Sequence, residues 1–216
     1  DHIPWQAIMG RAGNIYETYD EFMEAEGHRE WPSIAVYFYR DEWVMGDIEY
    51  QQALLEEIYK HQYNPIIFYG QYGSNPRVGI PNMKLSMNHL FGKDVFPFDV
   101  LINTCKFSFQ SLGAQTLEEL KLQGVPIVQG YTIYMDEQSW AADPQGVTPL
   151  DVNLSISQPE LDGVIHGGVV ACQTFDEQGH YMYLPVKERI GAVVQRAIKW
   201  SKLRHIPVSE RRVAII

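Results

Sequence analysis

The sequence is poor in positive charge and in cysteine. It holds 17 Lys and Arg residues against 27 Asp and Glu residues, a formal net charge of −10. A protein that neutralises phosphates needs clustered basic residues, so this balance argues against nucleic acid and anionic membranes as partners. The two cysteines, Cys105 and Cys172, fit no zinc-ligand spacing. Their apolar surroundings indicate reduced, buried thiols in a cytoplasmic protein.

Several sequence signatures of enzymes are absent as well. No GxSxG, HExxH, GxxxxGK[ST] or strand-following GxGxxG pattern occurs, which argues against a self-contained ATPase, hydrolase or dinucleotide enzyme. No segment approaches the roughly 18 consecutive apolar residues that a membrane-spanning helix needs. No two of the seven histidines are three or four residues apart, so the sequence predicts no helical metal pair and no metal site.

The chain does contain a regular alternation of apolar runs and amphipathic segments. Strands are expected at residues 33–39, 65–69, 99–106 and 125–129. Helices are expected at residues 48–61, 116–124, 148–158 (ending before Pro159) and 187–203. Two further strands, at residues 164–174 and 181–184, form a hairpin. The alternation predicts a three-layer α/β fold with a mostly parallel, flavodoxin-like or Rossmann-like sheet, plus a C-terminal hairpin and helix.

The two ends of the chain differ from this central module. Residues 1–30 are acidic and are predicted to be the tail of a preceding helical segment, with the α/β module at residues 31–208. Residues 209–216 are predicted to start the next strand or domain. Because the chain opens on Asp1 instead of Met and closes on a strand-like run, we expect it to be an internal piece of a longer protein.

Polar residues at the predicted strand ends are candidates for ligand binding, because ligands of such sheets bind at the carboxyl ends of the strands. They are Arg40, Asn103, Gln129, Glu160, Asp162 and His166. Arg40 is suited to bind a ligand carboxylate through two hydrogen bonds; alternatively it pairs with a carboxylate inside the fold. Glu160 and Asp162 either share protons or attract a cation, or they are ordinary residues of a solvated turn.

His166 precedes two glycines, where a backbone can approach a flat ligand closely. Its imidazole is a candidate axial ligand for a metal held by such a ligand, and the alternative is a hydrogen-bonded, half-buried histidine. For Glu188 and Arg189, at the start of the last helix, a structural clamp is favoured over a catalytic role. Aromatic residues near strand ends are candidates to line the site of a flat ligand, but for most of them we favour a place in the core. They are Tyr37, Phe38, Tyr39, Trp43, Tyr69, Tyr72 and Trp140.

Several stretches, taken in order, resemble one family of large proteins. Residues 36–47 contain Tyr-Phe-Tyr-Arg followed by a Trp and Gly-Asp, and residues 99–108 contain Asp-Val-Leu-Ile-Asn-Thr with Phe-Ser. Further matches are Val-Pro-Ile-Val-Gln at 125–129, Pro-Leu-Asp at 149–151, and Gln-Pro-Glu-Leu-Asp-Gly-Val-Ile at 158–165. A last run extends from Glu188 to Ile215. The order and spacing of these stretches resemble the CobN/magnesium-chelatase H family.

This resemblance implies a function for the parent protein. Members of the family are large subunits that bind a tetrapyrrole and insert cobalt or magnesium into a corrin or porphyrin precursor, while AAA+ partner subunits hydrolyse ATP. The alternative within the family is a haem-handling protein that removes metal from haem. The family's "HG..EWLPG" stretch is absent from these residues, so we expect no chelatase activity and no cofactor of its own in this piece.

Two hypotheses from different classes follow for the module itself. If it forms part of a tetrapyrrole cavity, Arg40 and His166 should point toward one shared cleft. If it is a scaffold that holds the rest of the parent chain or meets the ATPase partners, it should have a buried Arg40–carboxylate pair, no cleft, and a flat apolar face.

Overall fold

The computed structural model describes residues 3–71, 73–93 and 95–212. Within these residues, eight strands form one sheet in the order β2-β1-β4-β3-β5-β6-β7-β8. The central strands of this described sheet are all parallel: β3 (Ser33–Tyr39), β4 (Asn64–Gly70), β5 (Val100–Asn103), β6 (Ile127–Ile133) and β7 (Ile165–Phe175). Their order in space, with the second strand outside the first, is that of a flavodoxin-like sheet. The predicted fold class is confirmed.

Antiparallel strands lie at both edges of the sheet. β8 (Tyr181–Pro185) pairs with β7 as the predicted C-terminal hairpin. At the other edge, β1 (Ala7–Met9) pairs with β4, and β2 (Ile15–Tyr16) pairs with β1. The sequence predicted that residues 1–30 are the tail of a preceding helical segment. They are helical in α1 (Tyr19–Ala25), but β1, β2 and the buried Phe22 pack this segment into the same module.

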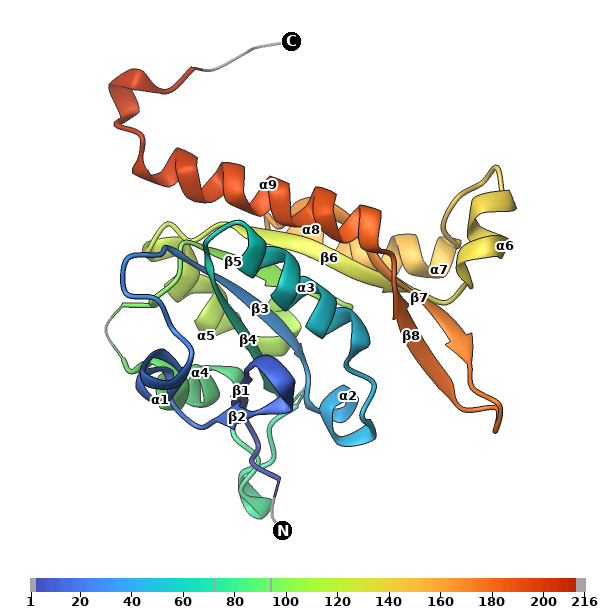
Figure 1. Cartoon of the computed structure of the whole chain (residues 1–216), viewed down its shortest axis with the longest axis horizontal. Coiled ribbons are helices and arrows are strands. Elements are labelled where there is room, and N and C mark those ends of the chain that lie inside the picture. Colours follow the sequence, from blue (N-terminus) through green and yellow to red (C-terminus); the bar gives the residue numbers. More distant parts are fainter. Residues whose placement is uncertain (1–2, 72, 94, 213–216) are drawn as a thin grey trace.

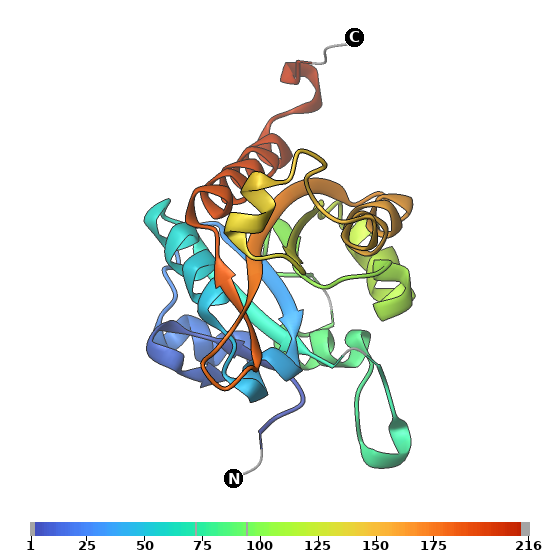
Figure 2. The same ribbon diagram turned by 90° about the vertical axis from the view of Figure 1, so that its right-hand side faces the viewer.

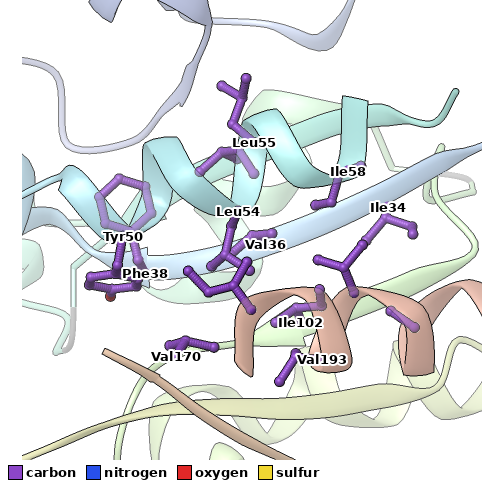
Figure 3. Close-up of a cluster of buried hydrophobic side chains, with 14 of the residues drawn as sticks. Ile34, Val36, Phe38, Tyr50, Leu54, Leu55, Ile58, Ile102, Val170 and Val193 are labelled. Carbon is purple, nitrogen blue, oxygen red and sulfur yellow. The ribbon is translucent and has the colours of Figure 1, made fainter. Parts of the chain in front are cut away.

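Helices cover both faces of the sheet and form the outer two layers (Figure 1). One face packs against α3 (Glu49–Lys60) and α9 (Lys187–His205). Figure 3 shows Leu54 and Ile58 of α3 above Ile34 and Val36 of β3. The other face packs against α1, α4 (Met83–Phe91) and α5 (Phe109–Leu122). Because both faces of β3 are buried, the strand is apolar from Ile34 onward instead of alternating.

The segment after β6 differs from the prediction. After α6 (Glu137–Ala142) come α7 (Pro149–Val152), a π-helical turn (Asn153–Ser157) and α8 (Gln158–Leu161), which run on without leaving helical dihedrals. The prediction that this helix ends before Pro159 is wrong. Pro159 lies inside this continuous helical segment, two residues after the π-helical turn ends at Ser157.

Three short 3-10 turns and one further helix complete the described elements of the chain. The turns are Arg11–Gly13, Pro76–Val78 and Val208–Glu210, and the helix α2 (Arg40–Met45) directly follows β3. Within residues 209–216, where a strand was predicted to start, residues 213–216 lie outside the described part of the chain. No helix among the described residues is long and apolar enough to cross a membrane.

Candidate ligand pocket

The carboxyl ends of the parallel strands lie at different levels. The register pairs Tyr37 of β3 with Asn103, the last residue of β5, and it pairs Asn103 with Gln129 of β6. β6 continues past that level to Ile133, and the hairpin of β7 and β8 extends beyond it. The extension lies at the right of Figure 1, and Figure 2 looks onto it. The longer strands therefore make a wall beside the ends of β3 and β5.

A pocket of about 560 Å³ lies against this wall. Small-molecule sites typically have volumes of about 300–1,000 Å³. In a flavodoxin-like sheet the strand order reverses between the first and third strands, here β3 and β5, and ligands bind in the crevice at that point. The pocket is lined from both strand ends, α2 and the hairpin: Tyr39, Asp41, Glu42, Met45, Asp47, Thr104, Lys106, Phe107, Thr132, Tyr134, Gln173, Tyr181 and Tyr183.

Glu42 of α2 is one of three acidic residues that line the pocket, with Asp41 and Asp47. Its Oε2 accepts hydrogen bonds from the Tyr50 hydroxyl (2.6 Å) and from Nε2 of Gln51 (2.5 Å). Both donors are fully buried residues of α3, so the contact between α2 and α3 holds the carboxyl group in place. Burial raises the pKa of Glu42 to about 8, against the opposing effect of the Tyr50 hydrogen bond. The group is therefore largely a neutral carboxylic acid at neutral pH.

Lys106 is the cationic group of the pocket and follows β5. Its Nζ lies 3.4 Å from Oδ1 of Asp151, and the two side chains are 8% and 0% exposed. The same Nζ lies 3.1 Å from the ring centroid of Tyr134, a cation–π contact. Burial lowers the pKa of Lys106 to about 8, although the Asp151 carboxylate favours the charged form.

The loop that carries Lys106 is fastened by two of the predicted site residues. Asn103 donates from Nδ2 to Oε1 of Gln129 (2.9 Å) and to the Cys105 carbonyl (3.2 Å). The Cys105 N–H donates to Oδ1 of Asn103, and Nε2 of Gln129 donates to the Cys105 carbonyl (2.8 Å). Both amides are buried, and neither lines the pocket. In this structure they hold the backbone just before Lys106.

The hairpin wall is tied to α2 by a second polar contact. The Tyr183 N–H donates to both carboxylate oxygens of Asp47, at 3.0 and 3.2 Å. Asp47 directly follows Gly46, which ends α2 in the left-handed conformation (φ 76°) that favours glycine. The turn after α2 thus places a carboxylate where it fixes the position of β8.

Arg40 has partners that were not expected. Its Nε donates to the Pro4 carbonyl (2.9 Å) and one of its terminal nitrogens to the Ile3 carbonyl (3.0 Å). Its guanidinium carbon lies 4.7 Å from the ring centroid of Trp5. Arg40 forms no ion pair with a carboxylate among the described residues, and it does not line the pocket. It holds the N-terminal segment against the start of α2.

Glu160 and Asp162 have different surroundings. Oδ2 of Asp162 accepts hydrogen bonds from the Ser108 hydroxyl (2.8 Å) and the Gln110 N–H (3.1 Å) at the start of α5. A carboxylate in this position caps unpaired N–H groups of a helix. Glu160 is exposed. The two carboxylates form no shared proton or cation site in this arrangement.

His166 lies on β7 beside β6, away from the pocket. Its backbone carbonyl accepts a hydrogen bond from Arg196, and its ring lies 5.6 Å from that of Tyr131. The next two glycines serve the sheet: the register with β6 shifts there, and a Cβ at Gly167 would collide with the Gln129 carbonyl. Gly168 has a φ of 149°, outside the range of most side chains. The glycines therefore form a β-bulge, and the pocket at the strand ends is lined by neither His166 nor Arg40.

Glu188 and Arg189 are exposed in the first turn of α9. The Arg189 guanidinium lies 5.4 Å from the ring centroid of Trp140 in α6, and neither residue lines the pocket. Among the aromatic residues assigned to the core, Tyr37, Phe38 and Tyr69 are fully buried as expected, whereas Tyr39 lines the pocket.

Sequence reasoning missed Glu42, Lys106 and Asp151. Their signals were present in the sequence: Glu42 and Lys106 each follow a predicted strand within a few residues, and Asp151 lies in the Pro-Leu-Asp stretch. Asp151 comes 45 residues after Lys106 in the chain, and local patterns do not reveal such a pairing.

Fold and pocket together describe a doubly wound α/β domain with a pocket at the switch point of its sheet. Comparison with known proteins gives the family. Residues 1–216 match the CobN/Magnesium Chelatase family, and the chain belongs to it.

Relatives match the chain over only part of their own length. An uncharacterized protein of Methanocaldococcus jannaschii, MJ0908, is 27% identical over 99% of this chain, which spans 18% of that protein. The aerobic cobaltochelatase subunit CobN of Pseudomonas aeruginosa is 28% identical over 54% of this chain and 10% of its own length. The catalytic subunit of cobaltochelatase from Mycobacterium tuberculosis has the same fold, with a TM-score of 0.72 at 22% identity over 98% of this chain and 17% of that one.

Proposed function

We propose that this chain is a domain of the large, tetrapyrrole-binding subunit of a metal chelatase, and that its pocket receives an edge of the tetrapyrrole. The reaction of the parent protein is then insertion of cobalt or magnesium, as substrate, into a corrin or porphyrin precursor. ATP would be hydrolysed by AAA+ partner subunits. The free, buried thiols of Cys105 and Cys172 support a cytoplasmic location, where thiols stay reduced.

The observation that carries this proposal is the pocket at the switch point. Its lining includes the aromatic residues Tyr39, Tyr134, Tyr181 and Tyr183, and flat apolar ligands pack well on such rings. The cavity hypothesis predicted that Arg40 and His166 share one cleft, and neither residue lines the pocket. The scaffold hypothesis predicted a buried Arg40–carboxylate pair and no cleft. The described residues contain a pocket and give Arg40 backbone carbonyls as partners.

His166 was the candidate axial ligand for a metal held by a tetrapyrrole, as a haem-handling role would allow. Nδ1 of His166 is buried, and the small void beside the ring is too narrow to hold a water molecule. An axial ligand needs an open coordination position above the metal. The geometry therefore favours the pocket over His166 as the place where a macrocycle meets this domain.

A porphyrin titration tests the proposal. Metal-free protoporphyrin is added to the chain, and binding is followed by porphyrin absorbance and by quenching of tryptophan fluorescence. We expect Gln173→Trp, which fills the pocket from β7, and Tyr134→Leu, which removes part of its aromatic wall, to weaken binding about tenfold or more, a loss of about 1.4 kcal/mol.

Arg40→Ala and His166→Ala are the matched controls, because both residues lie outside the pocket. Both should change the affinity less than about twofold, well under 1 kcal/mol. Absence of saturable binding by a chain that circular dichroism shows to be folded would overturn the proposal. So would binding that the two control variants weaken and the two pocket variants leave unchanged.

A further inference from the structure

Lys106 has hydrogen-bonding capacity that the protein does not use. An ammonium group carries three N–H donors. Within the described residues Nζ has one hydrogen-bond acceptor, Oδ1 of Asp151 at 3.4 Å, and otherwise faces the ring of Tyr134. Asp151 does not line the pocket, whereas Lys106 does. Burying an ammonium group with few hydrogen-bond acceptors costs free energy. An acceptor on the pocket side would therefore stabilise its remaining N–H donors.

Glu42 presents a second unused donor to the same space. Its Oε2 already accepts from both Tyr50 and Gln51. No described residue hydrogen-bonds to Oε1, and that oxygen is not among the buried unpartnered atoms. When the carboxyl group is protonated, the proton belongs on Oε1, because Oε2 is occupied as an acceptor. At neutral pH the pocket therefore offers an O–H from Glu42 and N–H groups from Lys106.

We propose that the end of the pocket between Glu42 and Lys106 binds a carboxylate of the ligand, whose flat body packs on the tyrosines of the wall. A carboxylate has two oxygens and accepts from both donors at once. This inference rests on the proposed function and deepens it: the substrate is held by an acidic side chain at its periphery, not only by its ring.

The other acidic groups around the pocket do not compete for this position. Asp47 is occupied by the Tyr183 N–H, and Asp151 does not line the pocket. Asp41 is exposed on α2, where solvent screens its charge. Burial raises the pKa of Tyr134 and of Tyr183, so neither ring ionises near pH 8. The ligand carboxylate therefore meets one cation and one neutral acid.

Proton uptake on binding is the distinctive consequence. Glu42 and Lys106 both have a pKa of about 8, so each is about half protonated at that pH. A bound carboxylate favours the protonated form of both groups, and binding at pH 8 should take up about one proton per ligand. An uncharged ligand of the same shape should take up much less.

The experiment compares protoporphyrin with its neutral diamide, in which both acid groups are converted to amides. Affinities are measured at pH 7, and proton uptake is measured at pH 8 by calorimetry in two buffers of different ionisation enthalpy. Wild-type chain should bind the diacid at least about tenfold more tightly than the diamide, since hydrogen bonds to charged groups contribute about 1.5–3 kcal/mol. Lys106→Met should bind both porphyrins with similar affinity and take up fewer protons.

Lys60→Met is the matched control, because Lys60 is an exposed lysine of α3 paired with Glu57; it should keep the preference for the diacid. If wild-type chain binds diacid and diamide equally and without proton uptake, the carboxylate subsite is overturned while the proposed function stands. If neither porphyrin binds, the proposed function itself fails. Because the two ligands are compared on wild-type protein, the result does not depend on how well Lys106→Met folds.

Discussion

Two groups of polar side chains lie near the carboxyl ends of β3 and β5. They differ in how many of their hydrogen-bond donors and acceptors have a partner within the described residues. Asn103 and Gln129 use their amides on each other and on the Cys105 backbone. Glu42 and Lys106, which line the pocket, keep donors for which the described residues supply no acceptor. The first group is complete without a ligand, and the second is not.

The presence or absence of hydrogen-bond partners distinguishes structural polar groups from candidate functional ones better than their position in the sheet does. Both groups occupy the carboxyl edge of the sheet, where ligand-binding residues are expected. Buried polar groups are normally hydrogen-bonded. A network in which every group has a partner is therefore explained by the fold alone, without a ligand. Buried groups with unused capacity and a shifted pKa are candidates for binding or catalysis. Glu42 and Lys106 meet both conditions.

The largest effect is expected from the pH dependence of stability. In the unfolded chain Glu42 ionises near its ordinary pKa of 4.5, and in the folded chain near 8. The folded state therefore holds a proton that the unfolded state has released, and the free energy of unfolding falls as pH rises from about 4.5 to 8. At about 1.4 kcal/mol per pKa unit, this amounts to roughly 3–5 kcal/mol.

Glu42→Gln should remove that slope while keeping a polar side chain beside Tyr50 and Gln51. The free energy of unfolding of variant and wild type is measured by urea unfolding at pH 5 and pH 8. From pH 5 to pH 8 the difference, variant minus wild type, should rise by about 3–5 kcal/mol. Lys106 acts at higher pH: its folded-state pKa is lowered to about 8, so wild-type stability should recover between pH 8 and 10.5. Parallel pH profiles for variant and wild type would show that Glu42 does not hold its proton in the folded state.

The second-largest effect is expected from removing one amide of the hydrogen-bonded Asn103–Gln129 pair. Asn103→Leu leaves Oε1 of Gln129 and the Cys105 N–H without a described partner, and unpaired buried groups cost about 1–3 kcal/mol each. We expect a loss of about 2–4 kcal/mol in the free energy of unfolding. The matched change is Gln173→Leu in the pocket wall, where the side chain is only partly buried and the cost should stay near 0.5 kcal/mol. Equal costs at the two positions would remove the distinction between the groups.

Most of the sheet could be predicted from the sequence, because its strands are continuous apolar runs between turn residues. Ser33–Tyr39 was predicted to the residue, and β7 and β8 nearly so. The start of α5 was placed too late, at Thr116. The helix begins at Phe109 and continues through a kink at Gly113, which local helix signals treat as a break.

The site was harder to predict, because its properties come from distant partners. The carboxyl edge of the sheet could be named as the candidate binding edge, since strand ends are visible in the sequence. Which polar residue faces the pocket depends on packing: Asn103 is paired by Gln129 from β6, and Glu42 is held by two residues of α3. Lys106 looks like an ordinary polar residue after a strand until Asp151 and Tyr134 are placed around it.

A smaller effect concerns the wall that separates the pocket from solvent. Asp47→Ala leaves the Tyr183 N–H without its carboxylate acceptor, which should cost about 1–2 kcal/mol and loosen β8 before the rest of the sheet. Hydrogen exchange should show faster exchange of the amides of residues 181–185, with β3 and β5 unchanged. Glu177→Ala, at the exposed tip of the hairpin, is the control. Faster exchange in both variants would mean that the tip, not Asp47, governs the hairpin.

The smallest effect is expected at Arg189, which belongs to neither polar group. Its guanidinium lies over the ring of Trp140 at the surface, and exposed cation–π contacts contribute about 0.5–1 kcal/mol. Arg189→Ala should therefore lower the free energy of unfolding by no more than that and change the fluorescence of Trp140. Porphyrin affinity should stay within twofold of wild type, because Arg189 does not line the pocket. A large loss of affinity would extend the functional group from the end of β5 to the start of α9, and would restore the catalytic interpretation of Glu188 and Arg189.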